Sequence, residues 1–200
     1  DIVIQAGWQQ IGNSQTPFEG TFDGDGHTIT YAKGAKCLFR RVGSGTIKNL
    51  KVQGAYIASA GIASSMGPEK SGGKNASLIN CTLLSGSNTL SCGLIGNSGG
   101  VSAIGCKVES GVKIGVDENG QPAAKGILGS IVGSGAFNLV SCRSGADLYS
   151  SGSYVGGLAG YKAFSMRDCS IKNSQFTGNI YADGEYIGGI LGGGYDDQTA

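Results

Sequence analysis

The sequence is poor in charged residues. Asp, Glu, Lys and Arg together make up 14% of its 200 residues, whereas about 25% is typical of soluble domains. The 15 basic and 14 acidic side chains nearly cancel and leave a net charge of +1. A nearly neutral chain offers no electrostatic basis for binding nucleic acid or an anionic membrane. We therefore expect no nucleic-acid partner.

Long apolar runs and helical patterns are also missing. No stretch approaches the roughly 18 apolar residues of a membrane-spanning helix, so we predict no membrane span in this segment. The first residues, Asp1-Ile-Val-Ile4, lack the basic start and long apolar core of a signal peptide. No segment shows sustained helical periodicity, which leaves strands and turns as the expected elements.

Residues that carry catalysis or bind metals are scarce. His27 is the only histidine, so a Ser-His-Asp mechanism would have to use it. His27 ends the segment Asp23-Gly-Asp-Gly-His27, and a role in a turn or in hydrogen bonding is a simpler interpretation of it than catalysis. The chain has no His-Glu-x-x-His and no Cys-x-x-Cys motif, and Asp23 and Asp25 lack the remaining ligands of a calcium loop. We predict no catalytic residue, no metal and no cofactor.

Glycine, in contrast, is abundant. It accounts for 38 of the 200 residues, close to one residue in five, whereas about 7% is usual. Many glycines lie in a recurring strip, best seen in Ser153-Tyr-Val-Gly-Gly-Leu-Ala-Gly160 and Tyr186-Ile-Gly-Gly-Ile-Leu-Gly192. The steps between the leading glycines of five copies are 32, 33, 31 and 32 residues. A period this constant indicates one structural unit stacked on copies of itself. The leading glycines are Gly61, Gly93, Gly126, Gly157 and Gly189.

A second strip alternates apolar and polar residues, as in Thr46-Ile-Lys-Asn-Leu-Lys-Val52, which is typical of a β-strand. Other copies of this strip have a cysteine at the position that Leu50 holds here. Because leucine can replace cysteine, we expect this position to be buried, with cysteine acting as a small apolar residue. We predict an internal column of reduced thiols. Disulfides between neighbouring copies are the alternative, although stacked side chains run parallel and do not converge. The column would hold Leu50, Cys81, Cys106, Cys142 and Cys169.

Short strands, many turn residues and the fixed period predict an all-β fold, a parallel β-helix of about five to six coils. Each strand would pair with its equivalent in the next coil, about 4.8 Å away. A β-propeller is the alternative, but its blades usually have about 40 residues or more.

The whole chain, residues 1–200, is expected to form a single β-helix domain. Bulky residues such as Trp8, Phe18 and Phe22 gather near the start, so we expect residues 1–35 to form an N-terminal capping coil and residues 36–200 to hold the repeats. An open stack needs a cap, and we therefore expect the repeats to continue beyond residue 200.

Several motifs resemble the GLUG-motif repeat proteins of bacteria, namely Trp8-x-x-Ile-Gly12, Phe22-Asp-Gly-Asp-Gly-His-Thr-Ile29, Thr46-Ile-Lys-Asn-Leu50 and the Gly-Leu-x-Gly strips. The resemblance covers nearly the whole chain and is specific for the repeat class. It implies a right-handed β-helix that is secreted or displayed on the cell surface. Such repeats occur in adhesin-like proteins and as accessory segments of immunoglobulin A-cleaving metallopeptidases. The peptidase chemistry of those proteins lies in a separate zinc domain, so no catalytic residue carries over.

Tyrosines are the candidate ligand-binding residues. Tyr154 and Tyr186 occupy the same position in two repeats, and Tyr161 and Tyr195 follow nearby. Flat aromatic surfaces can hold sugar rings; alternatively, these tyrosines only cover the repeats and stabilise them by stacking.

The expected function is that of a non-catalytic module, secreted or on a bacterial surface. Such a module would bind a host glycan or protein, or act as a spacer between further domains of the parent chain. Two alternatives stay open. The chain could be an accessory segment of an immunoglobulin A-cleaving metallopeptidase. It could also be a carbohydrate-active enzyme, a polysaccharide lyase or glycosidase, using paired carboxylates. The acidic pairs are Asp117 with Glu118, Asp183 with Glu185, and Asp196 with Asp197.

Overall fold

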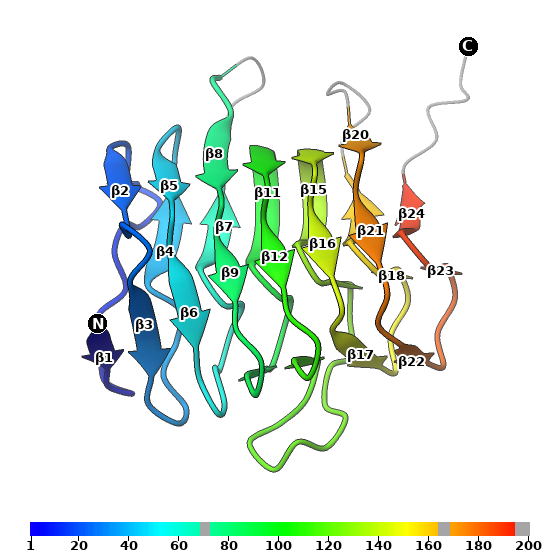
Figure 1. Ribbon diagram of the computed structural model, residues 1–200. Helices are drawn as coiled ribbons and strands as arrows, with labels where there is room; N and C mark the ends of the chain where they lie inside the picture. The colour runs from blue at the N-terminus through cyan, green and yellow to red at the C-terminus, as the bar shows by residue number, and fades with distance from the viewer. Residues whose placement is uncertain (69–72, 164–168, 195–200) are drawn as a thin grey trace.

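The computed structural model describes residues 1–68, 73–163 and 169–194. Within these ranges the protein is all-β, and no helix, and hence no membrane-spanning helix, is found there. The strands are short, and strands distant in the sequence lie side by side in chain order, from β1 near the N-terminus to β24 near the C-terminus (Figure 1).

The described strands form four sheets, and the two largest contain most of them. A seven-stranded sheet has the order β1 (Ile2–Ile4), β3 (Thr28–Tyr31), β6 (Lys51–Gln53), β9 (Thr82–Leu83), β12 (Lys107–Val108), β16 (Arg143–Ser144) and β21 (Gln175–Phe176). A ten-stranded sheet follows the path β2 (Thr21–Asp23), β5 (Thr46–Lys48), β8 (Ala76–Ile79), β11 (Ile95–Ile104), β15 (Val132–Val140), β19 (Ala159–Lys162) and β24 (Leu191–Gly194). Beside this path lie β4 (Phe39–Val42), β7 (Ala63–Met66) and β20 (Ser170–Lys172).

Two smaller sheets complete the described structure. One has four strands, β10 (Asn88–Thr89), β13 (Lys113–Ile114), β17 (Asp147–Ser150) and β22 (Ile180–Ala182). The other has three strands, β14 (Leu128–Gly129), β18 (Val155–Gly156) and β23 (Ile187–Gly188). The strands of both sheets pair in parallel, as do those of the larger two.

The parallel register places residues of the same kind side by side. Ile29 pairs with Val52, Val52 with Leu83, and Leu83 with Val108, and all four side chains are buried. Alternate residues of a strand point to opposite faces of a sheet, so this register produces buried columns of apolar side chains. Together these columns form one continuous core.

The spacing between paired strands is less regular than the sequence suggests. Val52 pairs with a residue 23 positions earlier, Ile29, whereas Val108 pairs with Ser144, 36 positions later. The longest separations between paired strands contain the segment 115–127, which lies between β13 and β14. This segment projects from one side of the stack (Figure 1, yellow-green). Variable segments of this kind absorb length while the register of the strands is kept.

This variation corrects one predicted repeat glycine. Ile95 pairs with Val132, and Val132 pairs with Ala159. The residue two positions before Val132 is Ser130, so the position predicted for Gly126 belongs to Ser130. Gly126 lies four residues earlier, at the end of the projecting segment. The corrected column is Gly61, Gly93, Ser130, Gly157 and Gly189, with steps of 32, 37, 27 and 32 residues.

Close approach of backbones explains three glycines of this column, Gly61, Gly93 and Gly157, whereas a Cβ atom on Gly189 would meet no atom within 4 Å. A Cβ atom on Gly93 would overlap the backbone oxygen of Ser130, and one on Gly157 would overlap that of Gly189. A Cβ atom on Gly126 would meet no atom within 4 Å. Ser130 is accommodated with its hydroxyl donating a hydrogen bond to the carbonyl of Gly157.

Cys169 was also assigned to the wrong position. Val140 pairs with Lys172 and Arg143 pairs with Gln175, so the residue opposite Cys142 is Ser174. Cys169 lies opposite Phe137, whose backbone N–H donates to the Cys169 Sγ at 3.4 Å. The equivalent strip is Ser170-Ile-Lys-Asn-Ser174, which matches Thr46-Ile-Lys-Asn-Leu50 and could have been recognised in the sequence.

The bend from the ten-stranded to the seven-stranded sheet uses a left-handed residue in each successive copy. Only glycine, and to a lesser degree asparagine, adopts this conformation readily. At this bend, five residues in equivalent positions have a positive φ, namely Asn49 (52°), Asn80 (51°), Gly105 (64°), Ser141 (56°) and Asn173 (50°). Four of the five are Asn or Gly, so local sequence explains this turn.

Candidate functional site

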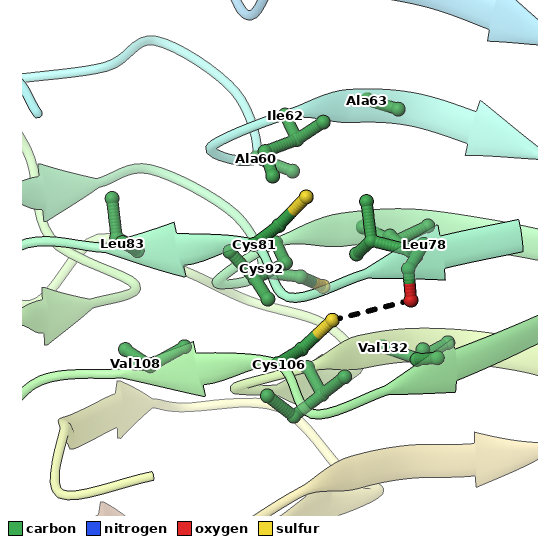
Figure 2. Close-up of a cluster of buried hydrophobic side chains, with 14 of the residues drawn as sticks. Ala60, Ile62, Ala63, Leu78, Cys81, Leu83, Cys92, Cys106, Val108 and Val132 are labelled. Carbon is green, nitrogen blue, oxygen red and sulfur yellow. Dashed lines mark hydrogen bonds between the residues drawn. The ribbon is translucent and has the colours of Figure 1, made fainter. Parts of the chain in front are cut away.

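The buried thiols form a structural column. Cys81, Cys106 and Cys142 are buried, and each Sγ donates to a backbone carbonyl of the neighbouring strand. The acceptors are Ile47 at 3.8 Å, Leu78 at 3.4 Å and Ala103 at 3.4 Å. Figure 2 shows the bond from Cys106 to the carbonyl of Leu78 within the apolar cluster. All six cysteines are free thiols.

Burial makes Cys81, and also Cys92 outside the column, unreactive. It raises the pKa of Cys81 and of Cys92 to about 11. The nucleophilic form of cysteine is the thiolate, and a thiol with this pKa is almost fully protonated at neutral pH. Cys81 therefore belongs to the core as an unreactive thiol. In the buried pair Cys106–Cys142, the contact between the two side chains raises the pKa of Cys106 and lowers that of Cys142.

The structure brings together three of the four tyrosines that the sequence singles out. The rings of Tyr154 and Tyr186 are stacked with centroids 4.8 Å apart and planes 3° from parallel. Tyr161 meets Tyr154 edge-on, with a centroid distance of 4.7 Å. Tyr186 is 57% exposed and Tyr154 is half-buried. Tyr195 lies outside the described residues.

Tyr154 and Tyr186 are also unusual in their backbone conformation. Their φ angles are 66° and 59°, in the left-handed region that bulky residues avoid at a cost of about 1–2 kcal/mol each. The backbone N–H of Tyr154 donates to the carbonyl of Glu185 at 3.0 Å, which ties the two turns together. A Cβ atom on Gly193 would lie 2.7 Å from the Tyr154 ring, so this glycine provides room for the ring.

A second tyrosine pair was not identified in the sequence analysis. Tyr149 pairs with Tyr181 in the four-stranded sheet, and their rings stack at 4.8 Å with planes 11° apart. Their separation of 32 residues equals that of Tyr154 and Tyr186 and was the available signal. Asp147 lies two residues before Tyr149, and Asn179 lies two residues before Tyr181. The Nδ2 of Asn179 donates a hydrogen bond to the Oδ1 of Asp147 at 2.8 Å, which adds a polar pair beside the stack.

The second pair lines a groove of about 470 Å³. The last part of the projecting segment, 122–125, also lines it, and Ala124 pairs with Ser150 of β17. The rest of the lining is small and polar, with one charge of each sign from Lys125 and Asp183. The complete lining is Pro122, Ala123, Ala124, Lys125, Tyr149, Ser150, Ser151, Ile180, Tyr181, Ala182 and Asp183.

The wall formed by the projecting segment is held in place by its own hydrogen bonds. The Oδ1 of Asp117 accepts the backbone N–H groups of Asn119 at 2.8 Å and Gln121 at 2.9 Å. The N–H of Ser151 donates to the carbonyl of Ala124 at 3.0 Å, which attaches the returning chain to the next strand. The groove is thus preformed.

The electrostatic environment keeps Tyr149 neutral. Burial, together with the nearby Asp147 and Tyr181, raises the pKa of Tyr149. Its hydroxyl therefore remains a hydrogen-bond donor at neutral pH. The site combines flat apolar ring faces with a few polar groups, an arrangement typical of small-ligand sites.

His27 and the turn that contains Asp23 and Asp25 take no part in this site. His27 Nδ1 lies 3.6 Å from Asp1 Oδ1, and both side chains are exposed. Asp25 continues a turn in which its N–H donates to Asp23 Oδ1. Among the described residues, no group of three or more His, Cys, Asp or Glu side chains could hold a metal ion. Asp196 and Asp197 lie outside those residues.

Comparison of the chain with protein-family models, with curated proteins and with solved structures gave no match. The resemblance to GLUG-motif repeats stays a prediction, and the candidate site rests on its geometry.

Proposed function

We propose that this chain is a non-catalytic, adhesin-like module that binds a glycan against its stacked tyrosines. The observation that carries this proposal is the Tyr149–Tyr181 stack beside a preformed groove of about 470 Å³. A sugar ring presents apolar C–H groups to an aromatic face, while its hydroxyls need donors and acceptors around the rim. Lys125, Ser151 and Asp183 supply such groups.

The finer architecture belongs to the same proposal. We infer that the sheets close into a right-handed parallel β-helix of about five to six coils, secreted or displayed on a bacterial surface. Further domains of the parent chain would accompany it. Pairing of strands that are 23 to 37 residues apart supports this arrangement. In such a rod, each coil adds one side chain to every outer column, so a repeated tyrosine becomes a stacked platform.

Three of the described carboxyl groups are unsuited to act as the acid of a glycosidase. A glycosidase needs a carboxylic acid whose pKa is raised, beside a second carboxylate. Hydrogen bonds lower the pKa of Glu19 through Ser44, of Asp23 to about 2 through Lys48, and of Glu109 through Lys107. These shifts keep the three groups ionised, which is the opposite of what a proton donor requires.

Titration calorimetry of saccharides selected on a glycan panel tests the proposal. We expect Tyr149→Ala and Tyr181→Ala each to weaken binding about tenfold or more, a loss of about 1.4 kcal/mol, because each removes a stacking face. Tyr181→Phe keeps the ring and should bind within about threefold of the wild type. Tyr56→Ala is a matched control, since Tyr56 does not line the groove.

A second pair of variants locates the ligand. Tyr154→Ala/Tyr186→Ala removes the neighbouring stack and leaves the groove lining intact. If this variant loses binding while Tyr149→Ala/Tyr181→Ala retains it, the ligand lies on the first stack and the groove assignment is wrong. Unchanged affinity in both double variants, with native circular dichroism, would contradict glycan binding by tyrosines.

A further inference from the structure

The only tryptophan of the chain is exposed, although it lies among the bulky residues expected to cover the first coil. Trp8 is 45% exposed, whereas the nearby Phe18 ring packs on Phe39 at a centroid distance of 5.1 Å. Trp8 borders a groove of about 440 Å³. The residues that line this groove are Gly7, Trp8, Gln9, Gln10, Gly12, Asn13, Thr16, Lys36 and Arg40.

Local hydrogen bonds hold the walls of this groove in place. The Oδ1 of Asn13 accepts the backbone N–H groups of Gln15 and Thr16, both at 2.8 Å, which closes a tight turn. The Nε2 of Gln10 donates to the carbonyl of Cys37 at 3.0 Å. The N–H of Arg40 donates to the carbonyl of Ile11 at 2.9 Å. The groove is therefore built on strand-like backbone and on a fixed turn.

The charge of the groove differs from that of the whole chain. Its lining contains two cations, Lys36 and Arg40, and no acidic residue. Within the described ranges, neither cation forms an ion pair with a carboxylate. On a chain with a net charge of +1, this is a local concentration of positive charge beside an exposed aromatic ring.

We propose that this groove is a second binding site, which takes an acidic sugar residue such as a uronate. The indole of Trp8 would cover the apolar face of the sugar ring. The guanidinium of Arg40 can bind a carboxylate through two hydrogen bonds, and Lys36 adds a second positive charge. The amide side chains of Gln9 and Asn13 are suited to ring hydroxyls. The site is independent of the tyrosine groove and stands even if that groove binds no glycan.

The single tryptophan provides a direct test, because all indole fluorescence of the chain comes from this groove. We expect titration with a short oligogalacturonide to cause a saturable change in emission. The methyl-esterified oligomer of the same length should bind at least tenfold more weakly, since esterification removes the carboxylate charge. Raising the salt concentration should weaken binding of the acid form only.

Charge-removing variants keep the test falsifiable. Arg40→Gln and Lys36→Gln should each weaken binding of the oligogalacturonide about fivefold or more and leave the emission of the free protein unchanged. Lys113→Gln removes an exposed lysine elsewhere and should bind within twofold of the wild type. Tyr149→Ala/Tyr181→Ala should leave the fluorescence titration unchanged, which separates this site from the tyrosine groove.

Three results would overturn the proposal. The first is the absence of a saturable emission change up to millimolar oligogalacturonide. The second is equal affinity for the acid and its methyl ester. The third is wild-type affinity in Arg40→Gln/Lys36→Gln.

Discussion

The buried thiols and the exposed tyrosines are two products of the same register. Cys81, Cys106 and Cys142 repeat one position on the inner side of successive strands. Tyr149 and Tyr181 repeat another position on the outer side, with rings 4.8 Å apart. In both regions, parallel pairing turns a sequence repeat into a column of like side chains.

The two columns differ in what the fold requires of them. An inner position must hold a small or medium apolar group, and Leu50 or cysteine meets this need equally. An outer position imposes no such demand, because water accommodates many side chains there. A stacked outer column of large aromatic residues beside a groove is therefore the better indicator of function, and the inner column is an indicator of stability.

The largest contrast should appear in unfolding free energies. Leu50→Ala removes a side chain that is 1% exposed and should lower the free energy of unfolding by about 2–5 kcal/mol. Tyr181→Ala removes a ring that is 53% exposed and should cost less than about 1 kcal/mol. Urea denaturation followed by circular dichroism measures both. Equal losses would mean that the outer stack is structural.

Buried thiols should react with an alkylating reagent more slowly than the thiol at the edge of the core. A raised pKa keeps a thiol protonated until the pH approaches that pKa. With a pKa of about 11, Cys81 and Cys92 should react with iodoacetamide at pH 8 about two orders of magnitude more slowly than unfolded cysteine. Cys169 is half-buried and should be modified first, as located by mass spectrometry.

The same reaction in denaturant, without reductant, is the control. All six cysteines should then be modified, because all are free thiols. Two or four unmodified cysteines would instead show disulfides and contradict a column of reduced thiols.

The smallest effect concerns the bend that separates the two large sheets. Ser141 has a φ of 56°, at the position that Asn49, Asn80 and Asn173 hold in other copies. Ser141→Asn should raise the free energy of unfolding by about 0.5–1 kcal/mol, because asparagine tolerates this conformation better. Ser102→Asn, within strand β11, is the matched control and should give no stabilisation. A lack of gain in Ser141→Asn would show that the bend is unstrained.

Much of the fold could be predicted because its signals are local. Alternation in Thr46-Ile-Lys-Asn-Leu-Lys-Val52 predicts a strand, and the structure has β5 and β6 there. The left-handed bend at Asn49 that divides them was not predicted. The Tyr154–Tyr186 contact followed from equal positions in two adjacent repeats. The Tyr149–Tyr181 pair carried the same 32-residue signal and was missed, since no glycine strip marks it.

Patterns in the amino-acid sequence are enough to predict an all-β chain with parallel pairing and columns of like side chains. These properties follow from alternation and repetition, which act over a few residues or over one repeat. The alignment of copies whose lengths differ could not be predicted in this way, and strand pairing places Ser130 where Gly126 was expected and Ser174 opposite Cys142. Backbone pairing sets that alignment, and projecting segments absorb the extra residues. The two grooves have the same origin, because each arises where segments distant in the sequence meet at the surface.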